Sequence, residues 1–310
     1  DSMMEAKRLS DKLGYEHEIL DLRDSFKETI IKNFVDEYLK GRTPNPCVVC
    51  NSDIKWGELI ERANELNCDY IATGHYARII NENGRFYLAK GIDENKDQTY
   101  FLYGLSQEDL KRTLFPLGGL KKDKIRKMAA ERGFVKLSEK KESQEICFIP
   151  DNDYRRFLTD EVPDQIQEIG DGDFVLPNGE KVGTHKGYPF YTIGQRKGLG
   201  VALGYPAYVV DIDAGTNTVT LGTKADLNGA GFVVGNVNLM KYNQIPEHGL
   251  EVNIKIRYRN QGTMGKIYPD GKHLKVDLYH NASAITPGQS AVFYENDDVV
   301  GGGLILSVRH

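Results

Sequence analysis

Residues 52–74, SDIKWGELIERANELNCDYIATG, decide the fold class of the N-terminal part of the chain. Residues 52–66 have the apolar spacing of an amphipathic helix, and DYIATG has the composition of a short buried strand. In parallel sheets ligands bind beyond the carboxyl ends of the strands, so Gly74 and His75 are predicted to lie at the mouth of a site.

The residues upstream extend this alternation. HEILDL (residues 17–22) predicts a short buried strand, and SFKETIIKNFVDEYLK (residues 25–40) predicts an amphipathic helix closed by Gly41. The order strand, helix, helix, strand predicts a parallel sheet flanked by helices, which is the α/β class.

The character of the chain changes twice further on. Helical patterns dominate residues 105–133, and from about residue 160 short alternating strands are separated by turn sequences such as DAGTNT, PDGK and ENDD. This pattern is typical of small β-barrels or sandwiches, and AVFYENDDVVGGGLI predicts a closing hairpin. We therefore expect three domains, over residues 1–150, 151–225 and 226–310.

Composition excludes several classes of protein. The 310 residues are 40% hydrophobic and 27% charged, as in an ordinary globular protein. No run approaches the roughly 18 apolar residues of a membrane span, and no signal peptide is evident, so a cytoplasmic location without a membrane partner is expected. The net charge of −5 means that a nucleic acid would need local basic patches.

Cys47 and Cys50 in GRTPNPCVVCN (residues 41–51) allow three interpretations. Structural zinc needs four ligands, and neither a second cysteine pair nor a histidine pair is present; a thioredoxin-like couple lacks its usual strand and Trp context. The third interpretation pairs Cys50 with Cys147 of SQEICFIP, one thiol carrying a persulfide sulfur and the other resolving it as a disulfide. A buried structural cysteine is the plain alternative for each thiol.

Polar and basic residues elsewhere suggest nucleic-acid contact. Basic side chains alternate with tyrosines in YTIGQRKGLG and KIRYRNQG, an arrangement on barrel strands that suits phosphate contact and base stacking. These basic residues are Arg196, Lys197, Lys255, Arg257 and Arg259. A solvated strand face would give the same pattern.

Taken in order, these stretches resemble the bacterial tRNA-specific 2-thiouridylases, the MnmA family, which make 2-thiouridine at the wobble position. The stretches are GRTPNPCVVCN, DYIATGHYAR, GIDENKDQTYFL, SQEICFIP, YTIGQRKGLG, IRYR and AITPGQSAVFY, and they span nearly the whole chain. The resemblance implies an adenine-nucleotide alpha-hydrolase-like domain of the PP-loop ATPase type, then a small central domain and a C-terminal β-barrel.

The resemblance also implies a chemistry and its partners. ATP, with Mg²⁺, adenylates the C2 oxygen of the wobble uridine, and a cysteine persulfide delivers sulfur. Cys147 matches the persulfide cysteine, and Cys50 matches the second cysteine, which releases the sulfur and forms a disulfide with Cys147. The implied partners are tRNA and a sulfur-relay protein or cysteine desulfurase, and no stably bound metal is expected.

The remaining site residues carry over one at a time. Asn45, Pro46 and Cys47 match positions that line the target base, and Gly74 matches an ATP contact. The matched tRNA contacts are His75, Lys96, Asp97, Gln98, Arg257, Tyr258 and Gln289.

Two features depart from the family pattern. Residues 1–310 contain no Ser-Gly-Gly-x-Asp-Ser loop, so this chain as it stands is expected neither to bind ATP appreciably nor to thiolate tRNA; tight binding in a calorimetric titration would contradict this. Cys47 occupies a position where some members carry Asp, and it could compete with Cys50 for a disulfide. The alternatives are a non-catalytic tRNA-binding fragment and a zinc-stabilised module built on Cys47 and Cys50.

Overall fold

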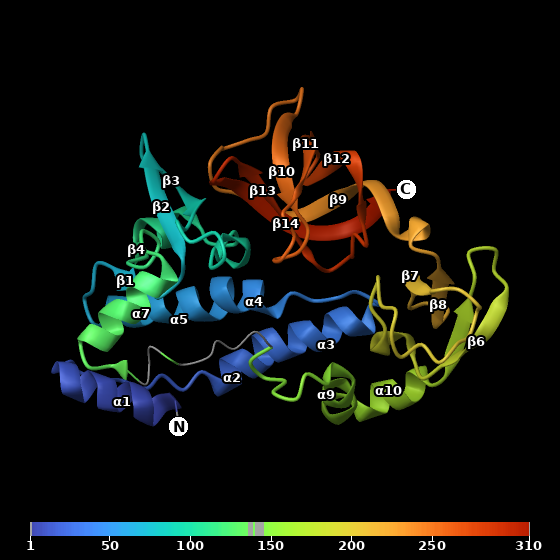
Figure 1. The fold of residues 1–310 in the computed structure, drawn as a ribbon, viewed down its shortest axis with the longest axis horizontal. Coiled ribbons are helices and arrows are strands. Elements are labelled where there is room, and N and C mark those ends of the chain that lie inside the picture. The colour runs from blue at the N-terminus through green and yellow to red at the C-terminus, as the bar shows by residue number, and fades with distance from the viewer. Residues whose placement is uncertain (1, 136–138, 140–145, 310) are drawn as a thin grey trace.

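The computed structural model describes residues 2–135, 139 and 146–309. Helices run along one side of the molecule, a β-barrel lies above them, and a small sheet lies at one end (Figure 1). None of the helices in the described ranges is long and apolar enough to cross a membrane.

The first long helical segment is confirmed. After α1 (Ser2–Leu13), the consecutive elements α2 (Arg23–Phe26), η1 (Lys27–Ile31, a π-helix) and α3 (Lys32–Leu39) form one continuous helix. Its buried face carries the predicted apolar residues Ile30, Phe34 and Val35. Gly41 follows the helix end with φ +72°, a backbone conformation that favours glycine.

The predicted strand at residues 17–22 is wrong. This segment has no regular secondary structure, and Ile19 and Leu20 are 59% and 37% exposed. A strand needs a neighbour to accept its backbone hydrogen bonds, and no described strand pairs with this segment. The parallel sheet expected in this region consists, among the described residues, of β1 (Ile71–Ala72) beside β4 (Thr113–Leu114).

The second predicted helix is confirmed and begins earlier than expected. It runs through α4 (Pro46–Val49), η2 (Cys50–Trp56, a π-helix) and α5 (Gly57–Glu65). Proline suits the first turn of a helix because its missing N–H has no intrahelical acceptor there. Trp56 is fully buried, and its indole N–H donates to Thr113 Oγ1 at 2.7 Å, which ties this helix to β4.

A hairpin joins the N-terminal part to the barrel. β2 (Ala77–Glu82) and β3 (Arg85–Lys90) are antiparallel, and β3 pairs with the barrel strand β14 through Ala89 and Asp298. The short helices η3 (Thr99–Phe101), α6 (Gln107–Lys111) and α7 (Lys122–Glu131) follow. The sequence did not indicate that this hairpin extends a sheet formed by residues two hundred positions later.

The central region has its own sheet and core. After α9 (Tyr154–Glu161) and α10 (Pro163–Ile169), four strands lie in the order β6-β5-β8-β7 around Phe174, Val209 and Val219. The strands are β5 (Gly172–Val175), β6 (Lys181–His185), β7 (Tyr208–Asp213) and β8 (Thr218–Gly222), with η4 (Tyr188–Phe190) between β6 and β7.

The placement of the basic residues on strands is wrong. Arg196 and Lys197 are exposed in the loop between η4 and β7, and Arg257 and Arg259 lie in the turn after β10. Only Lys255 is a strand residue, at the end of β10. The glycines of YTIGQRKGLG explain the loop, because Gly194, Gly198 and Gly200 all have positive φ.

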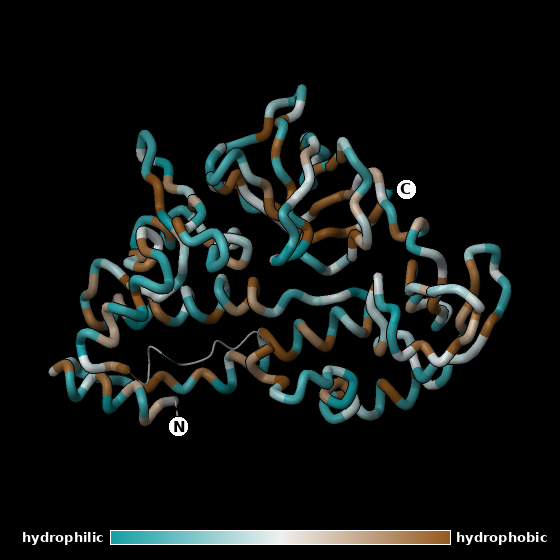
Figure 2. Tube along the Cα trace, in the orientation of Figure 1, coloured by the Kyte–Doolittle hydropathy of each residue, from teal (hydrophilic) through white to brown (hydrophobic). Residues whose placement is uncertain are grey.

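The predicted barrel and its closing hairpin are confirmed. Six antiparallel strands close on themselves because β13 pairs with both β10 and β14. They are β9 (Asn228–Leu239), β10 (Leu250–Lys255), β11 (Thr263–Asp270), β12 (His273–Ser283), β13 (Ser290–Glu295) and β14 (Asp298–Arg309), with η5 (Ala225–Leu227) before them. Hydrophobic and hydrophilic residues both occur along these strands (Figure 2), and apolar side chains such as Phe232, Val252 and Val276 form one buried cluster.

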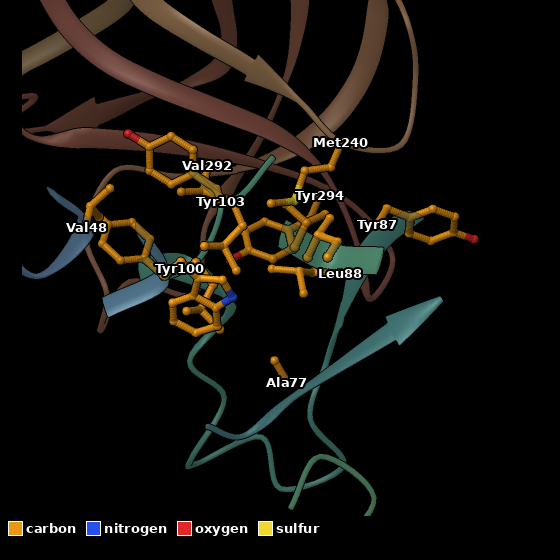
Figure 3. Packing of buried hydrophobic residues seen from close by; sticks show 14 residues of the cluster. Val48, Ala77, Tyr87, Leu88, Tyr100, Tyr103, Met240, Val292 and Tyr294 are labelled. Atoms are coloured by element: carbon orange, nitrogen blue, oxygen red, sulfur yellow. The ribbon is translucent and has the colours of Figure 1, made fainter. Parts of the chain in front are cut away.

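The N-terminal part and the barrel share one hydrophobic core. Tyr100, Tyr103 and Leu88 of the N-terminal part pack against Met240, Val292 and Tyr294 of the barrel (Figure 3). The two regions therefore hold each other in place, which matters for the site between them.

Candidate functional site

Residues 43–46, which contain the sequence Pro-Asn-Pro and are called the PNP turn below, precede Cys47 and Cys50 and are docked on the barrel. The Thr43 backbone N–H donates to Pro287 O at 3.0 Å. The Gln289 side-chain amide donates to Thr43 O at 3.1 Å and to Pro44 O at 2.8 Å. The loop before β13 thus fixes residues 43–44.

Asn45 continues this contact. Its Nδ2 donates to Ser290 Oγ at 3.4 Å, and buried Ser290 also bonds to Tyr100 and Tyr103. Helix α4 begins at the next residue, Pro46. The sulfurs of Cys47 and Cys50 are therefore presented from a helix whose start is set by barrel contacts.

Cys147 is held by the residues after it. The Phe148 ring packs edge-on against Phe26 of α2 and Phe34 of α3, with distances between ring centroids of 5.6 and 5.3 Å. Its centroid also lies 5.3 Å from that of Phe157 in α9. Ile149 is 1% exposed, whereas Cys147 is exposed. The charged stretch before it, including Glu142, Ser143 and Glu145, lies outside the described residues. An exposed thiol beside an anchored aromatic is accessible to reagents and partners.

The three thiols lie within electrostatic reach of one another. Partial burial raises the pKa of Cys47, and thiolate charge on Cys147 or Cys50 would raise it further. Burial also raises the pKa of Cys50, with a smaller contribution from Cys147, while the Lys55 ammonium acts in the opposite direction. Cys47 as a whole residue is nevertheless exposed to solvent.

The pKa of Cys50 is set mainly by its burial. A helix start generally lowers the pKa of a thiol, but burial of Cys50 outweighs that effect and the cation near it. All four cysteines of the chain, including Cys68, are free thiols in this structure.

His75 lies in an aromatic pocket beside this cluster. Its ring centroid is 5.5 Å from that of Trp56 and 6.1 Å from that of Phe115, and Nδ1 is 2.8 Å from Thr73 Oγ1. Burial, and secondarily the like charge of Lys55, lower the pKa of His75 to about 4. The imidazole is therefore neutral at pH 7.

Gly74 is exposed in the loop that follows β1, at the carboxyl end of a parallel pair of strands. An added Cβ would have Leu117 as its nearest neighbour, at 3.7 Å, so the fold itself does not require glycine here. A position open to solvent and free of steric demand from the protein fits the approach of a nucleotide to the backbone. Its contact with ATP stays a prediction.

The Lys96, Asp97 and Gln98 loop is tied to the residues next to His75. Gln98 exchanges two hydrogen bonds with the backbone of Tyr76, each 3.0 Å long. Asp97 is only 5% exposed and accepts hydrogen bonds from Gly91 and Thr99. Asp97 and Gln98 thus shape the loop and Lys96 is partly exposed, while their contact with tRNA stays a prediction.

Arg257 and Gln289 share a cavity of about 420 Å³ where the three regions of the chain meet. Arg257 donates to Ala284 O at 2.8 Å and Thr286 Oγ1 at 3.3 Å, and burial lowers its pKa. The other lining residues are Thr43, Tyr154, Thr192, Ile193, Gly194, Gln195 and Thr286. Among the residues that the structure describes, none of those lining the cavity is a carboxylate, so its charge suits an anionic group. Tyr258, the next residue after Arg257, is not among the residues given above as lining the cavity. Its ring packs on that of Phe101, with centroids 4.6 Å apart.

No group of three or more His, Cys, Asp and Glu side chains in the described part of the chain is arranged to hold a metal ion. The zinc-stabilised module on Cys47 and Cys50 gains no support from the structure.

Three residues near the candidate site were not predicted from the sequence: Lys55, Ser290 and Tyr154. Lys55 affects the pKa of Cys47, Cys50 and His75, yet an α-helical projection does not place it near Cys50. Ser290 and Tyr154 join the site only through tertiary packing. Cys50 and Lys55 are five residues apart, and residues at this spacing are neighbours in a π-helix. Reading the segment with π-helical spacing would therefore have linked Lys55 to Cys50.

Comparison with known families defines the class of protein. Residues 1–151 match the tRNA methyl transferase HUP domain, residues 155–223 the tRNA methyl transferase PRC-barrel domain and residues 230–305 the Aminomethyltransferase beta-barrel domain. The fold is thus a HUP domain followed by a PRC-barrel domain and a C-terminal β-barrel.

Curated relatives define the family. A protein of Amoebophilus asiaticus is 52% identical over 98% of this chain and 81% of its own length, and one of Cytophaga hutchinsonii is 50% identical over 99% and 83%. A protein of Salinibacter ruber is 50% identical over 99% and 81%. All three are named tRNA-specific 2-thiouridylase MnmA, which describes a different reaction from the methyl transferase wording of the first two domain matches. This chain belongs to the tRNA-specific 2-thiouridylase (MnmA) family.

Proposed function

We propose that this protein replaces the C2 oxygen of the wobble uridine of tRNA with sulfur, using Cys147 and Cys50. The observation that carries the proposal is that Cys50 and Cys147, 97 positions apart in sequence, are carried by segments that pack on the same helix. Phe148 packs on residues 23–39, which α4 and η2 also contact, and the charge of Cys147 contributes to the raised pKa of Cys50. Family membership supports the same substrate.

The proposed sulfur transfer balances with these two thiols. Cys147 carries the sulfur as a persulfide, Cys–S–SH, received from a sulfur-relay protein or cysteine desulfurase. The Cys50 sulfur attacks the inner sulfur of Cys147, which breaks the S–S bond, expels the outer sulfur as hydrosulfide and forms a Cys50–Cys147 disulfide. Hydrosulfide attacks C2 of the base, and a cellular thiol reductant restores both cysteines.

ATP, when bound, supplies activation of the C2 oxygen as a leaving group. Gly74 is the residue of this chain assigned to ATP, through its exposed backbone after β1. The residues of the chain otherwise orient the base: Asn45, Pro46 and Cys47 line the turn from which Cys50 is presented.

The tRNA is proposed to contact both sides of this turn. Arg257 supplies positive charge in the cavity between the three regions. His75 lies beside Trp56, and Lys96 lies in the loop that Gln98 ties to Tyr76. With a net charge of −5, the protein relies on such local contacts rather than on its overall charge.

The complete gene should therefore restore 2-thiouridine in a bacterial strain that lacks its own 2-thiouridylase. Digested tRNA is analysed by mass spectrometry for the exchange of oxygen for sulfur. We expect restoration with the native protein and with the exposed-thiol control Cys68→Ser, but none with Cys147→Ser. A methylated product, or tRNA binding without any thiolation, would overturn the proposal.

A further inference from the structure

The contact between residues 43–44 and residues 287–289 joins the N-terminal part of the site to the barrel. Three hydrogen bonds cross it, one from Thr43 N and two from the Gln289 amide. The bonds are 2.8 to 3.1 Å long. These are good hydrogen-bond distances, unlike those of a loose surface contact.

Gly288 shows how closely the two backbones approach. It has φ +90°, and an added Cβ would lie 2.7 Å from Thr43 O and 2.9 Å from Thr43 N. Any side chain here would push the PNP turn off the barrel.

The PNP turn has little internal support of its own. Pro44 and Pro46 have no N–H to donate, and the first hydrogen bond of the following helix runs from Val48 N to Asn45 O. The carbonyls of Thr43 and Pro44 are satisfied by Gln289. An unpaired carbonyl in this half-buried turn would be costly, so the turn depends on that donor.

Gln289 is itself held rigidly. Its backbone N–H donates to Thr286 O at 3.2 Å, and its carbonyl accepts from Ile305 N at 2.9 Å. A glutamine amide has two N–H donors, and both are used by the PNP turn. A direct contact of Gln289 with tRNA is therefore left to Oε1, which accepts hydrogen bonds and does not suit a phosphate.

We propose that Gln289 is a positioning residue, through which the barrel fixes the PNP turn and thereby the placement of Cys50 relative to Cys147. Its consequence for catalysis rests on the proposed thiolation, whereas the positioning itself can be tested without activity. The barrel is then part of the reaction site and not only a surface for tRNA.

The test compares Gln289→Met with Gln244→Met in the native chain. Gln289→Met removes both donors at nearly constant volume, and Gln244 is an exposed glutamine of the same domain without a hydrogen bond in the described structure. Hydrogen exchange of residues 42–50 should become about five- to hundredfold faster in Gln289→Met only, the range expected for loss of two hydrogen bonds. If Gln289→Met folds poorly, Gln289→Glu is measured, because its carboxylate repels the two carbonyls and gives the same direction.

A second readout follows the thiols. Mild oxidation with oxidised glutathione should give less Cys50–Cys147 disulfide in Gln289→Met than in the native protein. The melting temperature of the protein should stay the same, which shows that the barrel is intact. In the active protein, kcat should fall severalfold with little change in KM for tRNA. Unchanged exchange and disulfide yield together with a raised KM would show that Gln289 is a tRNA contact alone and overturn the inference. Loss of thiolation in every protein expressed from the complete gene, including the one without a substitution, would instead count against the proposed function.

Discussion

At the scale of single residues, the state of the thiols sets the chemistry. Burial raises the pKa of Cys50 above its usual 9.0, so in the free protein this side chain is a thiol at pH 7. Because the thiolate is the reactive form, the raised pKa makes Cys50 less prone to adventitious oxidation in the free protein.

The pH dependence of alkylation tests this state. The rate of Cys50 modification by iodoacetamide, followed by peptide mass spectrometry, should rise with pH and reach half its maximum above pH 9. The Cys68→Ser background removes the other exposed thiol that lies apart from the site. A midpoint near pH 7 would contradict the proposed burial effect.

The buried imidazole gives a second prediction at this scale. Because the folded pKa of His75 is about 4 and the unfolded value is 6.5, the unfolded state binds a proton first as the pH falls. The contribution of His75 to the free energy of unfolding is therefore complete above about pH 6.5 and is lost progressively toward pH 4. NMR titration of the ring protons should show no charge change between pH 7 and 5; a midpoint near 6.5 would refute the assignment.

At the scale of elements, the π-helix η2 brings Lys55 toward Cys50. In an α-helix the neighbours of Cys50 would be Asp53 and Ile54, and the wider π turn substitutes Lys55. The element thus places a cation, rather than an acid, near the thiols.

Replacing Lys55 tests this role of the element. Lys55→Met should slow Cys50 alkylation at pH 8 by about two- to threefold at low salt, since an exposed charge is partly screened by water. Lys55→Arg should keep the native rate, and high salt should remove the difference between the variants. Equal rates in all three proteins at low salt would show that the side chain has no electrostatic effect on the thiol.

The elements also show what the sequence could predict. Long amphipathic segments such as residues 25–40 and the turn-bounded barrel strands were predictable, because local apolar spacing reports the buried face directly. The strand at residues 17–22 was wrong because an apolar hexapeptide becomes a strand only beside a partner. Candidate site residues in long motifs, such as Asn45 and Cys147, could be proposed from the resemblance. Lys55 and Ser290 lie near them through helix geometry and tertiary contacts that no local pattern encodes.

At the scale of the whole molecule, the N-terminal part and the barrel share a core, while the central sheet has its own. Val292 of the barrel packs in the same cluster as Trp56, the single tryptophan of the chain, and Val219 belongs to the separate central cluster.

A pair of matched core substitutions tests this division. Val292→Ala should lower the denaturant midpoint of Trp56 fluorescence by an amount equivalent to about 1–3 kcal/mol, the cost of deleting buried methyl groups. Val219→Ala removes the same atoms from an equally buried site in the central sheet and should leave that midpoint nearly unchanged. Equal shifts for the two variants would mean that the chain unfolds as one unit.

The central claim is that Cys147 receives the sulfur and Cys50 resolves it. The most direct measurement is to load the protein with sulfur from a cysteine desulfurase and free cysteine, and then to locate the persulfide and any disulfide by peptide mass spectrometry. We expect a persulfide on Cys147, conversion to a Cys50–Cys147 disulfide, and accumulation of the persulfide in Cys50→Ser. A persulfide on Cys47 or Cys68 with Cys147 unmodified would contradict it.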